Sequence, residues 1–251
     1  MITLDMCSLP ILLLLIVTTL ARRATKGAVN RTFLFILFIV TVDTIFDAGA
    51  IQVNTHYMAG QTYYYALLEA SKITYLLLRN MTSFVLMLLV YAITRTAYKL
   101  KSKKSIFFMA MPLYIIMGLL LTNPLHHLIF TITPGAGYAH GPLSFLLYAV
   151  STAYAAYGLG YLIRYSKFIS KERFFTLVAI FAIQLVAVLV QYFVKVMRFE
   201  MFGATVGCLL MVLVVLRPEE IIDAATGLLS WNAYKREIGR ASCRERVCLS
   251  V

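Results

Sequence analysis

The stretch ITYLLLRNMTSFVLMLLVYAI, residues 73–93, decides the fold of this chain, because Arg79 is its only charged side chain. Roughly 20 apolar residues in a helix cross a hydrocarbon layer about 30 Å thick, so this stretch predicts a membrane-spanning helix. Six more windows of similar length and character lie between charge clusters along the chain. The seven windows are residues 3–21, 32–53, 73–93, 106–122, 143–162, 174–194 and 201–216.

The composition of the whole chain excludes a water-soluble globular enzyme. Hydrophobic side chains make up 61% of its 251 residues and charged ones only 14%, whereas an average soluble domain carries about 25% charged residues. The mean hydropathy is +0.82. A core of this size cannot bury so much apolar surface, which must therefore face lipid. We predict an all-α membrane protein, a seven-transmembrane helix bundle that occupies residues 1–216.

Lys and Arg residues between the windows predict the orientation of the bundle. Basic side chains are retained on the cytoplasmic side during membrane insertion. The loops after the first, third and fifth windows are rich in Lys and Arg, whereas residues 54–61 and 123–141 contain neither. This alternation predicts that the N-terminus lies outside and the C-terminus in the cytoplasm. We interpret the net charge of +12 as contact with the anionic face of a lipid bilayer, and expect no nucleic acid as a partner.

Neither a metal site nor a cofactor is expected from the sequence. The chain contains four cysteines, Cys7, Cys208, Cys243 and Cys248. Their spacing matches neither a set of metal ligands nor a disulfide framework. The adjacent histidines at 126–127 are poor metal ligands together, because neighbouring side chains on a helix diverge by about 100°.

Ionisable side chains inside the windows predict a polar site between the second and third helices. A charge buried in a bilayer costs a few kcal/mol or more unless it is paired. Asp43 and Asp47 are four residues apart and share one helix face. At about 1.5 Å per residue, Asp47 and Arg79 each lie roughly 9 Å below the outer ends of their windows. We expect an ion pair between Asp47 and Arg79, with Asp43 beneath it. Glu69 and Lys72 would lie above it, in a site open to the outside.

The sequence leaves the role of these charges open. An ion pair between two helices can simply hold them in register. It can also form a site that senses an external ligand or ion, because ionisable groups inside a membrane are functional candidates. A small-solute transporter would use the same residues as its binding site. A retinal-type photoreceptor is excluded, because window 201–216 contains no Lys for the Schiff base.

Residues 217–236 differ in composition from the windows and predict a cytoplasmic linker into a further domain. Pro218 suits the first turn of a short helix. An Asp, two intervening residues and a Thr-Gly-Leu tripeptide then resemble the entry of the GGDEF domain of diguanylate cyclases. The matching residues are Asp223, Thr226, Gly227 and Leu228. In that family the motif marks the junction between the signalling helix and the catalytic domain, so the resemblance implies the start of a truncated GGDEF domain.

The last residues, 237–251, resemble over positions 237–247 the translation of a common short-read sequencing adapter. We interpret this tail as artefactual and derive no function from it. Neither the GGDEF signature nor its acidic metal-binding strand follows residue 236. This fragment is therefore not expected to be an enzyme, and its parent protein is interpreted as a diguanylate cyclase.

Residues 1–216 resemble the seven-transmembrane N-terminal sensor region of bacterial histidine kinases and diguanylate cyclases, in helix number, orientation and the linker that follows. The resemblance implies a multi-pass sensor in the bacterial inner membrane that works as a homodimer. We expect it to couple an unknown external or intramembrane stimulus, through the helix at 201–216, to a GGDEF output domain. The alternatives are the sensor module of a histidine kinase and a small-solute transporter.

Overall fold

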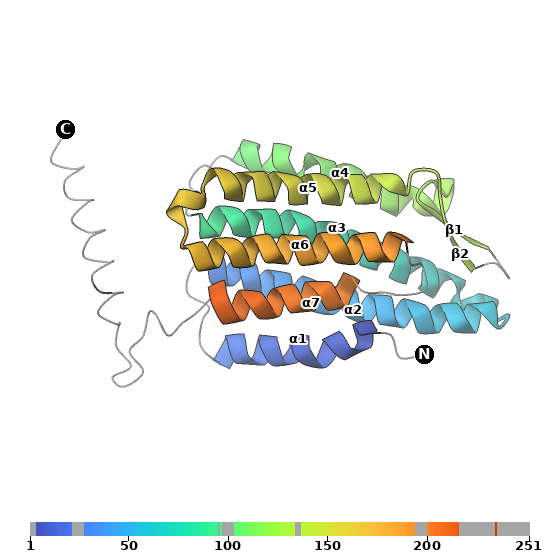
Figure 1. Ribbon diagram of the computed structural model, residues 1–251. Coiled ribbons are helices and arrows are strands. Elements are labelled where there is room, and N and C mark those ends of the chain that lie inside the picture. The colour runs from blue at the N-terminus through green and yellow to red at the C-terminus, as the bar shows by residue number, and fades with distance from the viewer. Residues whose placement is uncertain are drawn as a thin grey trace.

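In the computed structural model the chain folds into an up-and-down helical bundle (Figure 1). The structure describes residues 4–21, 28–94, 96, 103–133, 137–193, 200–215 and 234. The long helices are α1 (Leu4–Ala21), α2 (Ala28–Met58), α3 (Tyr65–Ile93), α4 (Lys103–His126), α5 (Phe145–Arg164), α6 (Lys171–Phe193) and α7 (Glu200–Leu210). The short elements are η1 (Thr62–Tyr64), β1 (Phe130–Thr133), β2 (Gly137–His140), η3 (Ser166–Phe168) and the π-helical turn η4 (Met211–Val215), which continues α7.

The predicted windows and the observed helices correspond one to one in the described part of the chain. Four described helices, α2 to α5, are long and apolar enough to cross a membrane, and α1 and α7 are shorter apolar helices. A helical membrane bundle is thereby confirmed, while seven crossings and their orientation stay predictions. In Figure 1 helix α1 begins on the side of the bundle that carries β1 and β2, and the described part of α7 and η4 ends at the opposite end.

Threonines inside the helices show how the chain tolerates hydroxyl groups in an apolar bundle. Thr41 donates to the Leu37 carbonyl at 2.7 Å, and Thr44 donates to the Val40 carbonyl at the same distance. A hydroxyl that bonds back to the carbonyl four residues earlier needs no water. These threonines can therefore be buried without breaking the helix.

Two separate apolar clusters fill the bundle. The seven-helix core receives buried side chains from all seven helices, among them Leu12, Leu37, Leu89, Leu162, Leu177 and Met211. The hairpin core lies at the end that carries β1 and β2, and it contains Leu68, Ile116, Leu120, Ile129, Phe130 and Leu147. Helices α2 to α5 contribute to both cores, whereas the residues of α1, α6 and α7 whose burial the structure describes contribute only to the seven-helix core.

The hairpin of β1 and β2 departs from the predicted all-α fold. The two strands pair antiparallel, with Phe130 opposite His140 and Thr133 opposite Gly137. The Asn123 side chain at the end of α4 accepts bonds from the backbone N–H groups of residues 129 and 130 and donates to the carbonyl of 130 at 3.0 Å. One amide side chain thus satisfies three backbone hydrogen-bonding groups where the chain passes from α4 into β1. Gly141 follows the hairpin, and a Cβ there would collide with the backbone of Leu128.

Helices α2 and α3 are longer than their apolar windows. They contain 31 and 29 residues, or about 46 and 43 Å at 1.5 Å per residue, which exceeds the thickness of a hydrocarbon core. Asp47 therefore lies about 16 Å from the end of α2, and Arg79 about 21 Å from the start of α3. The predicted depth of roughly 9 Å, counted from the ends of the apolar windows, stays a prediction, because both helices continue beyond their windows.

Candidate functional site

A layer of polar side chains lies where the two apolar cores meet. We call these residues the polar layer: Asp43 and Asp47 on α2, Arg79, Asn80 and Ser83 on α3, Ser151 on α5, Gln184 on α6 and Glu200 on α7. The exposed fractions of Asp43, Asp47, Asn80 and Glu200 are 1%, 4%, 1% and 5%. Burial of so many ionisable and amide groups is costly unless they are paired or bound, which makes the layer the candidate site.

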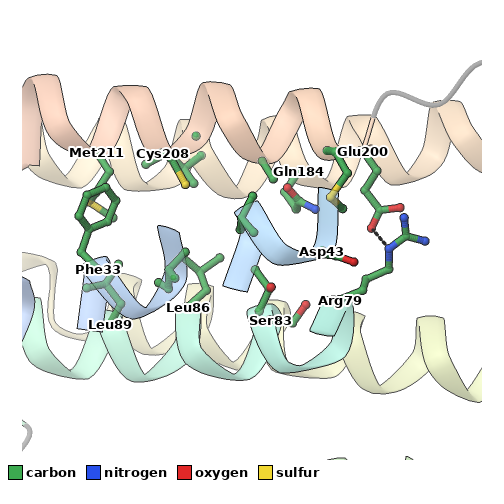
Figure 2. Close-up of a pocket in the computed structure, with 17 residues that line it drawn as sticks. Phe33, Asp43, Arg79, Ser83, Leu86, Leu89, Gln184, Glu200, Cys208 and Met211 are labelled. Atoms are coloured by element: carbon green, nitrogen blue, oxygen red, sulfur yellow. Dashed lines mark ion pairs between the residues drawn. The ribbon is translucent and has the colours of Figure 1, made fainter. Parts of the chain in front are cut away.

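An ion pair joins two helices across this layer. The Arg79 Nε atom on α3 lies 3.2 Å from the Glu200 Oε1 atom on α7, and both side chains are nearly buried (Figure 2). Glu200 is the first residue of α7, where the positive end of the helix dipole favours an acidic side chain. The central helix α3 is thus tied to the last described helix of the bundle.

The expected partner of Arg79 was Asp47, and the structure adds Glu200 to the site. Asp43 and Asp47 both lie close enough to attract Arg79 electrostatically, so the predicted carboxylates do gather around the guanidinium. Sequence analysis placed Glu200 just outside the seventh window and missed it. An acidic residue directly before an apolar run is a helix-start signal that could have included it.

Lys72 lies about two helical turns before Arg79 on α3, on the side of the hairpin. Its ammonium group is 4.8 Å from the ring centroid of Tyr75 and 5.0 Å from that of Tyr138 on β2. The Arg79 guanidinium lies 5.3 Å from the centroid of the same Tyr75 ring, so Tyr75 contacts both cationic side chains. Cation–π contacts of this kind contribute about 0.5–2 kcal/mol each. The hairpin therefore closes over the cationic side of the site.

Glu69 lies apart from the ion pair. It is half-buried and accepts a hydrogen bond from the Tyr65 hydroxyl at 3.4 Å. The predicted junction residues Asp223, Thr226, Gly227 and Leu228 lie outside the described residues. The polar layer, with Lys72 beside it, is therefore the part of the predicted site that the structure assembles.

A first cavity of about 60 Å³ opens between α2, α3, α6 and α7. Figure 2 shows Asp43, Arg79 and Glu200 at one end of this cavity and Phe33 and Met211 at the other. A water needs roughly 10–15 Å³ of such space, so the cavity has room for a few water-sized groups.

A second cavity of about 80 Å³ lies between α3, α5 and α6, beside the first turn of α7. Its lining is mostly apolar and includes the polar side chains of Asn80, Ser151 and Thr152. Arg79 and Glu200 line both cavities, so the ion pair forms a common wall. The Ser83 and Ser151 hydroxyls, which bond to each other, hold α3 against α5 at this level.

In the described residues, no group of three or more His, Cys, Asp or Glu side chains is arranged to hold a metal ion. The polar layer offers three carboxylates, a guanidinium, two amides and two hydroxyls beside two small cavities. This chemistry suits recognition or charge rearrangement.

Comparison with known proteins identifies the family. Residues 6–219 match the family described as the N-terminal 7TM region of histidine kinase. No curated protein and no solved structure matches the chain. The family is a membrane sensor region, which agrees with the helical bundle. Because the match covers most of the chain, this protein belongs to the family of N-terminal seven-transmembrane regions of histidine kinases.

Proposed function

We propose that this chain is the sensor module of a bacterial inner-membrane signalling protein, and that the polar layer passes a stimulus to α7. The stimulus changes the polar layer or the hairpin above it, and α7 carries the change toward a cytoplasmic output domain. The family match supports a membrane sensor module. The observation that carries the proposed route is the ion pair between Arg79 on α3 and Glu200 at the start of α7.

The packing of α7 supports a role in transmission. Gly203 and Gly207 on α7 face α6, and a Cβ at these positions would lie 2.9 Å from Ala187 Cβ and 3.2 Å from Ile180 Cγ2, respectively. Small residues let the two helices approach closely. At its far end α7 continues into the π-helical turn Met211–Val215, a geometry that often occurs at functional sites. A displacement at Glu200 would reach this turn through one short helix.

The output domain is the less defined part of the proposal. The motif at residues 223–228 favours a GGDEF domain, whereas the family match favours a histidine kinase. The genomic DNA downstream of codon 234 discriminates between them, because it encodes either a GGDEF signature or a phospho-accepting His motif. Cyclases and kinases of this type act as pairs, so we also propose a homodimer.

The proposal is tested in the full-length gene by measuring its output, either cyclic di-GMP or autophosphorylation. Arg79→Gln and Glu200→Gln should each shift output in the same direction, because either change removes the link between α3 and α7. The exchange of both charges, Arg79→Glu with Glu200→Arg, should move output back toward the native level. Ser8→Ala on α1 is the matched control, since Ser8 is buried but lies outside both cavities.

Two outcomes contradict the proposal. The first is unchanged output in both single variants while the protein stays folded in the membrane. The second is solute uptake by the isolated chain in vesicles, because a sensor module is not expected to transport solutes.

A further inference from the structure

All four histidines of the chain lie at the end of the bundle that carries the hairpin of β1 and β2. They are His56, His126, His127 and His140. His56 and His126 lie in the last turns of α2 and α4, His127 follows α4, and His140 is the last residue of β2 (Figure 1). All four side chains are exposed. Imidazole is the side chain whose ordinary pKa gives a change of charge between pH 5 and 8, so we expect protons to bind at this end of the bundle in that range.

The other charges near the hairpin do not balance a set of protonated histidines. Beside the histidines, the described titratable or charged side chains on the surrounding elements are Tyr57 on α2, Tyr63 and Tyr64 on η1, Tyr65, Glu69, Lys72 and Tyr75 on α3, Tyr138 on β2 and Tyr148 on α5. A tyrosine ordinarily stays neutral between pH 5 and 8. One lysine and one glutamate cancel each other, so four protonated imidazoles would add up to four uncompensated positive charges.

His140 shares one aromatic ring with the cationic side of the site. Its Nδ1 atom lies 3.4 Å from the Tyr138 hydroxyl, and the two rings meet edge to face with their centroids 5.2 Å apart. The Lys72 ammonium lies 5.0 Å from the centroid of the same Tyr138 ring. Phe130 on β1, which is opposite His140 in the hairpin, stacks on Tyr138 at 5.7 Å. Tyr138 therefore contacts both an imidazole that can gain a charge and an ammonium that already carries one.

From Lys72 the contacts continue to the polar layer. The Lys72 ammonium lies 4.8 Å from the ring centroid of Tyr75, and the Arg79 guanidinium lies 5.3 Å from the same centroid. Arg79 in turn pairs with Glu200 at the start of α7. A contiguous set of side-chain contacts thus leads from an exposed residue at the end of β2 to the first residue of α7.

A proton on His140 changes both contacts of Tyr138. A neutral Nδ1 atom can accept a hydrogen bond from the Tyr138 hydroxyl, whereas a protonated one can only donate. The imidazolium and the Lys72 ammonium then compete for one ring, because an aromatic ring attracts either cation while the two like charges repel each other. Protonation should therefore weaken the contact between Tyr138 and Lys72 and loosen the hairpin from α3.

We propose that the hairpin end is a proton-binding site, in which protonation of His140 loosens the contact between Tyr138 and Lys72 and so changes the polar layer. The proton is taken up from the side of the membrane that the hairpin faces. The inference rests on the proposed sensor function, whose stimulus it names, but its first test is made on this chain alone and needs no output domain.

The first test measures amide hydrogen exchange of the purified full chain in lipid nanodiscs from pH 5 to pH 8, corrected for the intrinsic rate of each amide. We expect the protection of β1 and β2 to be about threefold lower at pH 5 than at pH 8, because the two like charges repel each other. His140→Gln and Lys72→Met should each abolish this difference, since either removes one of the charges. His126→Gln is the matched control and should keep it, because His126 is also exposed at this end but lies on α4.

Two results of the exchange experiment overturn the proposal. The first is protection of the hairpin that does not depend on pH in the native chain. The second is an equal pH dependence in the native chain and in His140→Gln, which changes an exposed side chain and decides the question even where Lys72→Met fails to fold.

The second test measures the output of the full-length protein in proteoliposomes while the pH on the hairpin side is varied from 5 to 8. Output should change across this range in the native protein and stay constant in His140→Gln. Constant output in the native protein would overturn the proton as the stimulus, and the sensor function would still stand if Arg79→Gln and Glu200→Gln shift output. Unchanged output in those two variants would contradict the sensor function itself, whereas the exchange experiment would still decide whether the hairpin binds a proton.

Discussion

The seven-helix core and the hairpin core are held together by different means. The seven-helix core packs apolar side chains from all seven helices and glycines from α5 and α7, with many large hydrophobic residues on its outer surface. The hairpin core is built from α2 to α5 and a two-stranded sheet, and specific polar contacts from Asn123 and Lys72 close it. The first region is held together by apolar packing, whereas the second is held together by apolar packing and by the polar contacts of its hairpin.

The polar layer lies at the junction of these two regions. Asp43 on α2 follows the last buried residue of the seven-helix core on that helix, Val40, and precedes Ala50 of the hairpin core. Helix α7 begins at this level with Glu200 and continues only through the seven-helix core. A change in the hairpin core can therefore reach α7 through α2, α3 and the charges between them. Substitutions in either core test this division.

The largest effect is expected where the two cores meet. Arg79→Leu leaves Glu200 buried without its cation, beside Asp43 and Asp47. Breaking a buried ion pair from one side costs about 3–5 kcal/mol, so the free energy of unfolding should fall by that amount. Chemical unfolding in bicelles measures it. Glu200→Gln added to Arg79→Leu should recover part of the loss, because one uncompensated charge disappears.

The control for Arg79→Leu is Glu69→Gln on the same helix. Glu69 is half-buried and interacts with Tyr65, so its neutralisation should change stability by about 0.5 kcal/mol or less. A loss in Arg79→Leu no greater than that in Glu69→Gln would mean that the ion pair does not join the two cores.

A smaller effect, confined to one region, is expected at Asn123. Asn123→Leu removes the amide that bonds the backbone of residues 129 and 130, and leaves buried N–H groups unsatisfied. The cost should be about 2–3 kcal/mol. Hydrogen exchange should accelerate at the amides of β1 and β2 and stay unchanged in α6 and α7. Equal acceleration in both regions would show that the two cores unfold as one unit.

The seven-helix core is tested by Gly203→Ala. The added Cβ would lie 2.9 Å from Ala187 Cβ, so α6 and α7 must move apart. Overpacking of this kind costs typically about 1–3 kcal/mol, and we expect about 1.5 kcal/mol with no change in hairpin exchange. Gly160→Ala on α5 is the matched control, because nothing lies within 4 Å of its added Cβ. Chemical unfolding of both variants should separate them, and equal stability would contradict close packing at Gly203.

The positions of the helices could be predicted from the sequence because a bilayer imposes a length and a composition on each crossing. The ends of the helices could not be predicted in this way, because an apolar window ends at the first polar residues, whereas the helix continues through them. α2 continues to Met58 beyond its apolar window, and Tyr57 in this extension is buried in the hairpin core. The hairpin itself carries a weak signal, the alternation of buried Phe130 and Ile132 with more exposed threonines.

The site was predictable in part for a related reason. Asp43, Asp47 and Arg79 stand out as charges inside apolar windows, and the structure brings them together. Glu200 lies just outside the predicted window 201–216, because a charged residue ends an apolar run. Which helix lies against α3 at that level is a property of the bundle, and no local pattern in the sequence specifies it.

The smallest expected effect concerns the contact through which the hairpin closes on the site. Tyr138→Leu keeps an apolar side chain on β2 but removes the ring that lies 5.0 Å from the Lys72 ammonium. The expected loss is about 1 kcal/mol, whereas Tyr138→Phe keeps the ring and should lose less than half of that. Chemical unfolding combined with the Lys72→Met variant forms a double-mutant cycle, which isolates the pair from the packing of the ring. A coupling energy near zero would mean that the hairpin rests on the bundle by apolar packing alone, and a stimulus at the hairpin would then reach the charges only through α2 and α3.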